Sequence, residues 1–151
     1  EAYQIFLEDG YVLKIYDAYR PQRAVDHFCR WGEVLEDCRR KPIHYPNVSK
    51  AAMFDEGYIA RRSGHTRACA VDLTLVDAKT HQELDMGSGF DFMDPRSWPD
   101  SDQVTEQQRK NRYILRDAML ASGFAPYECE WWHFTVDPEP YPDTYFDFPI
   151  R

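Results

Sequence analysis

Residues 68–77 read ACAVDLTLVD, the strongest strand signal in the chain, because β-favouring apolar residues alternate along it. Val71, Leu73 and Leu75 fall on one face of the predicted strand, and Asp72 falls on the other. The strand therefore offers an apolar face to a core and carries a carboxylate on its opposite face.

Two further segments have the same β-rich character, YVLKIY at 11–16 and EWWHFTV at 130–136. Short strands joined by hairpins, with helices on one face, indicate an α+β fold. We expect residues 1–151 to form a single domain, in which helices pack on a central antiparallel sheet.

Two helices are predicted from their end signals. Pro21 favours the first turn of a helix, and the helical spacing of apolar residues continues towards the basic run 39–41. Thr105 and Gln108 form a capping-box pattern at the start of a second helix, which Gly123 ends.

Composition excludes two classes of partner. The chain has 18 Lys and Arg against 26 Asp and Glu, a net charge of −8, which disfavours binding to the phosphates of nucleic acid. No apolar run approaches the roughly 20 residues that a membrane-spanning helix needs.

The four cysteines lack a C-x-x-C spacing, which argues against a zinc ribbon or a thioredoxin-like pair.

Histidines and carboxylates that could bind a metal ion or act in catalysis lie in two of the predicted strand regions. His65 lies seven residues before Asp72, and Glu130 lies three residues before His133. Two imidazoles and one carboxylate suit a catalytic zinc ion, which keeps a fourth position for water. Glu130 would be the base beside it. In a regular strand an odd offset separates two side chains onto opposite faces, so this hypothesis requires the backbone to bend at both places.

Other polar and aromatic residues have simpler interpretations. A lone histidine is usually a surface residue or a hydrogen-bonded core residue, and we interpret His27, His44 and His81 in that way. Trp131 and Trp132 are interpreted as core residues. A zinc module that binds a partner without catalysis is a second hypothesis for the chain, although such a module would not need Glu130.

At these residues the chain resembles a known family, the zinc-dependent D-alanyl-D-alanine dipeptidases of the vancomycin-resistance type. The similarity extends over nearly the whole chain and keeps the order of the family's motifs. These are YDAYRPQRAV (16–25), SGHTRACAVDLTL (63–75), MGSGFDFMD (86–94), EWWHF (130–134) and EPYPDTYFDFP (139–149).

The resemblance implies a catalytic centre. It makes His65, Asp72 and His133 the ligands of one Zn²⁺ ion per chain, in a cleft of the fold. Glu130 would serve as general base and acid, and Arg20 would stabilise the tetrahedral intermediate. From the residues alone, Arg20 is open to a plainer interpretation, which is an ion pair with a neighbouring carboxylate such as Asp17.

The resemblance also implies a small D,D-dipeptide substrate. Asp91 would hold the free amino group, Tyr58 would line the same pocket, and Ser63 would lie near the substrate carboxylate. The expected reaction releases free D-alanine from D-alanyl-D-alanine, in vancomycin resistance or in D-alanine recycling. The alternative is a zinc D,D-carboxypeptidase or endopeptidase that acts on longer peptidoglycan stem peptides.

Two departures from the family pattern are visible. Ala68 stands where the family has glycine, which adds a Cβ at a turn before the strand. Family members also carry an N-terminal segment before the first strand, and we expect this chain to begin after it. Either that segment is disordered or cleaved off, or this chain is an abbreviated form with a more open site. The expected compartment is the bacterial cytoplasm, with the periplasm as alternative, and the sequence is compatible with an oligomer.

Overall fold

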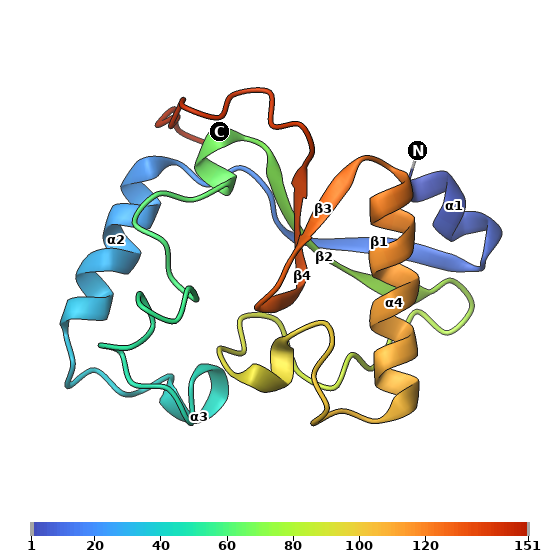
Figure 1. The fold of residues 1–151 in the computed structure, drawn as a ribbon, viewed down its shortest axis with the longest axis horizontal. Coiled ribbons are helices and arrows are strands. Elements are labelled where there is room, and N and C mark those ends of the chain that lie inside the picture. Colours follow the sequence, from blue (N-terminus) through green and yellow to red (C-terminus); the bar gives the residue numbers. More distant parts are fainter. Residues whose placement is uncertain (1, 151) are drawn as a thin grey trace.

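The computed structural model describes residues 2–150, and Figure 1 shows how its elements are arranged. The elements, in chain order, are α1 (Ala2–Glu8), β1 (Tyr11–Asp17), α2 (Gln22–Glu33), α3 (Lys41–His44), the 3₁₀ turn η1 (His65–Arg67), β2 (Ala70–Asp77), the 3₁₀ turn η2 (Pro95–Ser97), α4 (Glu106–Ala121), β3 (Phe124–Tyr127) and β4 (Glu130–Val136). Within this part of the chain, none of the helices is long and apolar enough to cross a membrane.

The strands form one four-stranded sheet in the order β1-β2-β4-β3, and every neighbouring pair is antiparallel. The sheet and its helices confirm the predicted α+β fold. β2 and β4 occupy the centre of the sheet, which places Asp72 directly opposite His133 in the register. The helix predicted from Thr105 is also confirmed, because Thr105 and Gln108 form the complete capping box of α4.

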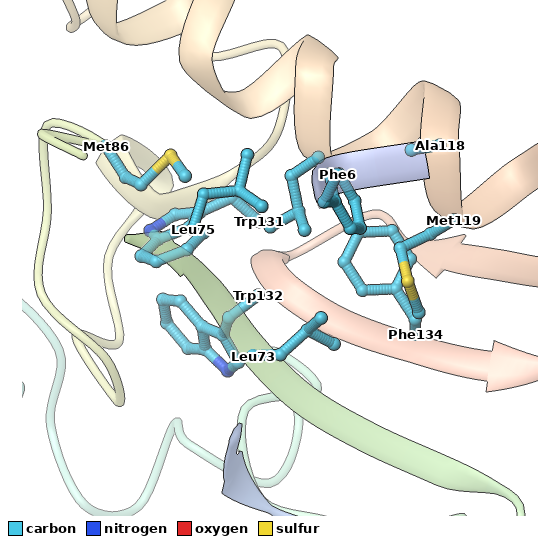
Figure 2. Close-up of a cluster of buried hydrophobic side chains, with 10 residues drawn as sticks. Phe6, Leu73, Leu75, Met86, Ala118, Met119, Trp131, Trp132 and Phe134 are labelled. Carbon is cyan, nitrogen blue, oxygen red and sulfur yellow. The ribbon is translucent and has the colours of Figure 1, made fainter. Parts of the chain in front are cut away.

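The main core lies between the sheet and the helices α1 and α4, as Figure 2 shows. Leu73 and Leu75 enter this core from β2, which confirms the predicted apolar face of the strand. Trp131 and Trp132 are buried in the same core with 3% and 1% of their surfaces exposed, as expected from the sequence. The core thus fixes the central strands and leaves their other face to the pocket described below.

The prediction that helices cover only one face of the sheet is wrong for α2. Figure 1 shows α1 and α4 on one side of the sheet, and α2 with α3 on the other. Val25 and Phe28 of α2 line a pocket that also contains Asp72 and His133 from the sheet. A second apolar cluster supports this wall, formed by the buried residues Tyr45, Val48, Met53, Tyr58 and Ile59.

The end of α2 also differs from the prediction, because the helix stops at Glu33 and does not reach the basic run 39–41. The buried ammonium group of Lys50 donates hydrogen bonds to the backbone carbonyls of Trp31 and Val34, at 2.9 and 2.7 Å. These bonds satisfy carbonyl groups that a helix leaves unpaired at its C-terminus. Pro42, which directly follows the basic run, occupies the first turn of α3.

The long loop between β2 and α4 is ordered by one buried arginine. The Arg112 guanidinium donates hydrogen bonds to the carbonyls of Met86, Arg96 and Trp98, at 2.6, 2.9 and 2.7 Å. Arg112 projects from α4 and only 1% of its surface is exposed. The helix therefore holds the loop that carries Asp91.

We predict that Arg112→Ala lowers the free energy of unfolding by about 3 kcal/mol, because it leaves three buried carbonyl groups without donors. Urea unfolding followed by circular dichroism measures the change. Lys110→Ala on the same helix is the matched control, because Lys110 forms an ion pair with Glu106 at the surface. That control should change stability by less than about 0.5 kcal/mol. Equal changes in both variants would contradict this account.

Candidate metal centre

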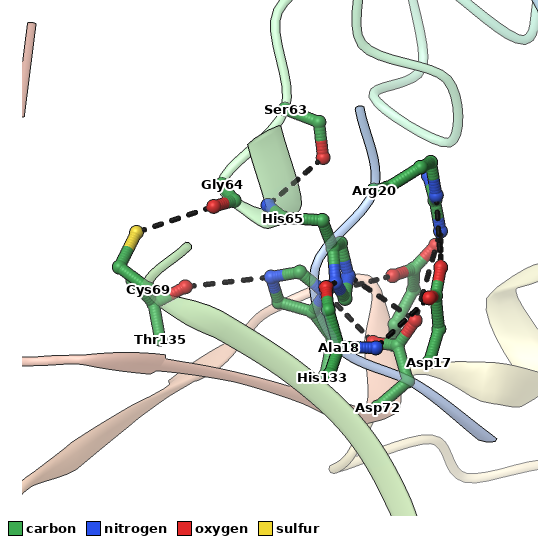
Figure 3. Close-up of polar contacts among 11 residues, drawn as sticks. Asp17, Ala18, Arg20, Ser63, Gly64, His65, Cys69, Asp72, His133 and Thr135 are labelled. Carbon is green, nitrogen blue, oxygen red and sulfur yellow. Dashed lines mark hydrogen bonds and ion pairs between the residues drawn. The ribbon is translucent and has the colours of Figure 1, made fainter. Parts of the chain in front are cut away.

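Three elements meet to form a cluster of metal-binding side chains. His65 comes from η1, Asp72 from β2 and His133 from β4, and Figure 3 shows the three side chains directed at one another. One nitrogen or oxygen from each residue lies within 4.8 Å of the others. The structure thus brings together all three residues that the sequence nominated as ligands.

The distances within the cluster are short. Asp72 Oδ2 lies 3.2 Å from His65 Nε2, and Asp72 Oδ1 lies 2.9 Å from His133 Nδ1. The two imidazole nitrogens are 3.3 Å apart. A tetrahedral site with metal–ligand bonds of about 2.1 Å separates its donor atoms by about 3.4 Å, so this spacing fits a single ion.

The protonation of His65 supports the same conclusion. Its Nδ1 lies 2.6 Å from the carbonyl oxygen of Ala18, which can only accept a hydrogen bond, so Nδ1 carries the proton. In the neutral ring, Nε2 then carries a lone pair, and this nitrogen faces the Asp72 carboxylate and the His133 imidazole. Such a convergence of acceptors is stabilised by a cation, and a hydrogen bond from the outer nitrogen to a carbonyl is typical of metal-binding histidines.

Both odd offsets are resolved by local bends. Ala68 adopts the left-handed conformation, with φ 55° and ψ 33°, and this turn lets His65 precede the strand instead of lying in it. The conformation costs an alanine about 1 kcal/mol relative to a glycine. Ala68 therefore accommodates the turn at a modest cost, and the departure from the family's glycine does not displace His65.

The bend in β4 is a bulge. Pro126 of β3 pairs with Phe134, whereas the next residue, Tyr127, pairs with Glu130, so residues 131–133 are extra on β4. Bulges redirect side chains beside functional sites. Here the bulge turns Glu130 and His133 towards the same pocket, and Glu130 Oε2 lies 3.8 Å from His133 Nδ1.

The electrostatic environment of Glu130 is unusual for a glutamate. Burial, followed by repulsion from Asp72 and Asp91, raises the pKa of the Glu130 carboxyl well above its ordinary value. Burial also acts to raise the pKa of Asp72, but the interactions of its carboxylate with His133 and His65 outweigh burial and lower that pKa. Three carboxyl groups in one pocket form an anionic site, which a divalent cation would compensate.

The position of Arg20 is compatible with both of its predicted roles, the ion pair with Asp17 and a place beside the metal cluster. Its Nη2 lies 2.6 Å from Asp17 Oδ2, the ion pair that the sequence allowed. The same nitrogen is 3.9 Å from Asp72 Oδ2, which brings the guanidinium to the edge of the metal cluster (Figure 3). The ion pair with Asp17 therefore holds Arg20 in place beside the proposed reacting centre.

The remaining predicted residues line the same pocket, which has a volume of about 260 Å³. Asp91, Ser63 and Tyr58 all contribute to its wall. Asp91 has a left-handed backbone with φ 56°. Burial, followed by repulsion from Asp72, raises the pKa of Asp91 to about 6. His44, interpreted from sequence as structural, lies against the backbone carbonyl of Asp91 at 3.2 Å.

Sequence reasoning missed Tyr127, which also lines the pocket. Its ring meets that of His133 edge-on at 5.6 Å, and its hydroxyl donates to the carbonyl of Gly57 at 3.0 Å. Tyr127 thus joins the end of β3 to the wall that contains Tyr58. A single tyrosine before a turn gives no signal of this role, because the contact spans 70 residues of sequence.

A polar pocket with a His-Asp-His cluster, of which His65 and Asp72 are buried, and with an adjacent glutamate is typical of a metal-dependent hydrolase. Comparison with known proteins specifies the class. The whole chain, residues 1–151, matches the peptidase family M15 described as D-ala-D-ala dipeptidase. The chain belongs to this family, whose members are generally metal-dependent.

Three bacterial relatives are named D-alanyl-D-alanine dipeptidase. The protein of Streptomyces coelicolor is 55% identical over 141 residues, which cover 93% of this chain and 70% of the relative. The protein of Enterococcus faecium is 42% identical over 151 residues, or 100% of this chain and 75% of the relative. The protein of Enterococcus faecalis is 45% identical over 141 residues, with shares of 93% and 70%.

We predict that a divalent metal ion stabilises the folded chain, because the three donors meet only after folding. Free metal at a thousand times its Kd adds about 4 kcal/mol to the free energy of unfolding. Thermal unfolding after chelation and after titration with Zn²⁺, Co²⁺ or Ni²⁺ measures the effect. His65→Ala should abolish the metal-induced increase in Tm, whereas His81→Ala, at an exposed turn, should retain it. The same increase in both variants would contradict the assignment of the donors.

Proposed function

We propose that residues 1–151 act as a zinc-dependent catalytic domain that hydrolyses D-alanyl-D-alanine to two molecules of D-alanine. The observation that carries this proposal is the placement of Glu130 3.8 Å from His133, in a pocket that also holds Asp91. A base beside the metal cluster and a second carboxylate for an amino group are the two requirements of a metallopeptidase for short free peptides. The names of the relatives support the same substrate.

His65, Asp72 and His133 would hold the zinc ion. When bound, zinc polarises a carbonyl group and lowers the pKa of water towards 7. Glu130 takes the proton of the attacking water and returns it to the departing amine. The raised pKa of Glu130 suits this exchange, because a carboxylate with a low pKa would not hold the proton between the two steps.

Arg20 stabilises the negative oxygen that develops as water attacks the carbonyl. Its guanidinium is fixed by Asp17 before the substrate arrives and lies at the edge of the metal cluster. Preorganised donors of this kind contribute roughly 3–4 kcal/mol to stabilisation of a transition state. The ion pair with Asp17 thus supports catalysis by holding the donor in place.

Asp91 limits the substrate to short peptides with a free amino group. A carboxylate in a partly buried pocket is stabilised by a substrate ammonium group, whereas an acylated nitrogen leaves it without a partner. The alternative expectation, a carboxypeptidase or endopeptidase for stem peptides, is not favoured by the relatives, which are named as dipeptidases. In the cell, the reaction would serve vancomycin resistance or recycling of D-alanine.

We predict that Glu130→Gln retains the metal but lowers kcat for D-alanyl-D-alanine by at least about 100-fold, because the amide cannot accept the proton of water. Metal content by elemental analysis and release of D-alanine are measured on the same preparations. Glu128→Gln is the matched control, since Glu128 is exposed two residues away. Near-normal turnover in Glu130→Gln would remove Glu130 from the mechanism.

We predict that Asp91→Asn weakens selection for a free amino group. Asparagine tolerates the left-handed backbone of this position, so the variant removes the charge with little change of conformation. The kcat/KM for D-alanyl-D-alanine should fall about 10- to 100-fold, whereas that for the N-acetylated dipeptide should change little. Equal losses on both substrates, or loss of the metal, would indicate a structural role.

A further inference from the structure

Three arginine side chains line the pocket, and two of them are already paired with carboxylates. Arg20 Nη2 lies 2.6 Å from Asp17. Arg67 donates through Nε to Glu139 at 2.6 Å and through Nη2 to the other oxygen of the same carboxylate at 2.7 Å. The positive charges of these two guanidinium groups are therefore balanced within the protein.

Arg62, the third arginine, is different. Among residues 2–150, no carboxylate forms an ion pair with Arg62. Its guanidinium lies over the ring of Tyr145, 4.8 Å from the ring centroid. Stacking on an aromatic ring restrains the guanidinium plane and leaves its N–H groups free to bind an anion at the edge. The pocket wall therefore contains a restrained and unneutralised cation.

The next residue, Ser63, provides a second donor. Its buried hydroxyl oxygen accepts a hydrogen bond from the backbone N–H of His65 at 3.2 Å. In that arrangement the hydroxyl proton is left to donate, and no acceptor for it lies among residues 2–150. Arg62 and Ser63 both line the pocket, so its wall offers a guanidinium and a hydroxyl group from consecutive residues. A carboxylate is the group that this pair of donors fits.

Of the two charged groups of a dipeptide, the carboxylate has so far been given only a neutral partner, because the family resemblance places the Ser63 hydroxyl near it. The ammonium group is on the α-carbon next to the scissile carbonyl, where Asp91 would receive it, and the free carboxylate is on the leaving residue, on the other side of the scissile bond. Arg20 cannot serve both the reacting carbonyl and this carboxylate, because it is paired with Asp17 and lies 3.9 Å from Asp72. We infer that Arg62 binds the free C-terminal carboxylate of the dipeptide, next to the Ser63 hydroxyl that the resemblance already places near that group. This inference rests on the proposed function.

Arg62 is then a specificity residue, and its effect differs from that of a purely structural one. If Arg62 only anchored the C-terminal tail through Tyr145, its loss would impair every substrate equally. If it binds the carboxylate, its loss impairs substrates that have the carboxylate and spares those that lack it. D-alanyl-D-alanine and its C-terminal amide differ in this one group, and hydrolysis releases free D-alanine from both.

The test compares kcat/KM for these two substrates in the zinc-loaded wild type and in Arg62→Ala, Arg62→Lys and Arg61→Ala. The Arg61 control is closely matched, because its guanidinium stacks on Phe54, also at 4.8 Å, but Arg61 does not line the pocket. We expect Arg62→Ala to lower kcat/KM for the acid about 10- to 100-fold, as is typical for loss of a charged hydrogen bond, and to lower that for the amide far less.

The measured quantity is the ratio of kcat/KM for the free acid to kcat/KM for the amide. We expect this ratio to fall strongly in Arg62→Ala, to recover partly in Arg62→Lys and to keep its wild-type value in Arg61→Ala. An unchanged ratio in Arg62→Ala, or the same collapse in Arg61→Ala, overturns the inference. The failure of the proposed function looks different, because wild type would then release no D-alanine from the free dipeptide.

Direct binding supplies a readout that does not depend on turnover. In chains that also carry Glu130→Gln, calorimetry measures the Kd of the free dipeptide and of its amide. The chain that retains Arg62 should bind the free dipeptide with a lower Kd than the amide. Arg62→Ala should remove this difference in Kd, while metal content and Tm stay unchanged. Equal weakening for both ligands would overturn the assignment and indicate a structural role for the stack on Tyr145.

Discussion

The structure depends on one electrostatic constraint, which is the convergence of three electron-pair donors at a single point. The hydrogen bond from His65 Nδ1 to the carbonyl of Ala18 leaves Nε2 as a lone pair, 3.3 Å from His133 Nδ1. The Asp72 carboxylate faces both rings. Lone pairs that face one another repel unless a cation lies between them. A metal ion held by the three donors would therefore stabilise their arrangement, and this would link the stability of the central strands to metal binding.

The first of these donors is held in place by the opposite end of the chain. The backbone N–H of Phe146 donates to the carbonyl of Thr66 at 2.9 Å, and Arg67 forms its paired hydrogen bonds with Glu139. Both contacts act on η1, the turn that carries His65. A 3₁₀ turn of three residues has little intrinsic stability. Its position is thus set by the tail that crosses it, and the proline-broken sequence after β4 is part of the catalytic scaffold.

Much of the fold follows from local sequence, and the shape of the site does not. β2 and α4 were predictable because alternation and the Thr105 capping box are local signals. The end of α2 was not, since it depends on Lys50, which is distant in sequence. The resemblance nominated the metal ligands, but spacing alone argued against their convergence. The bulge that reconciles the two arises from pairing between β3 and β4, a long-range feature that no local pattern encodes.

The balance of charge in the pocket explains how recognition and catalysis are coupled. Asp72, Asp91 and Glu130 raise the cost of each other's ionisation, so adding a positive charge to any part of the pocket favours the charged form of the rest. A metal ion would compensate the charge of the cluster, and a substrate ammonium group would compensate that of Asp91. Since the pKa of Asp91 lies at about 6, its carboxylate is poised to gain most from a charged partner. A neutral, acylated substrate would offer no such compensation, so on the proposed role of Asp91 the pocket would discriminate by electrostatics as well as by size.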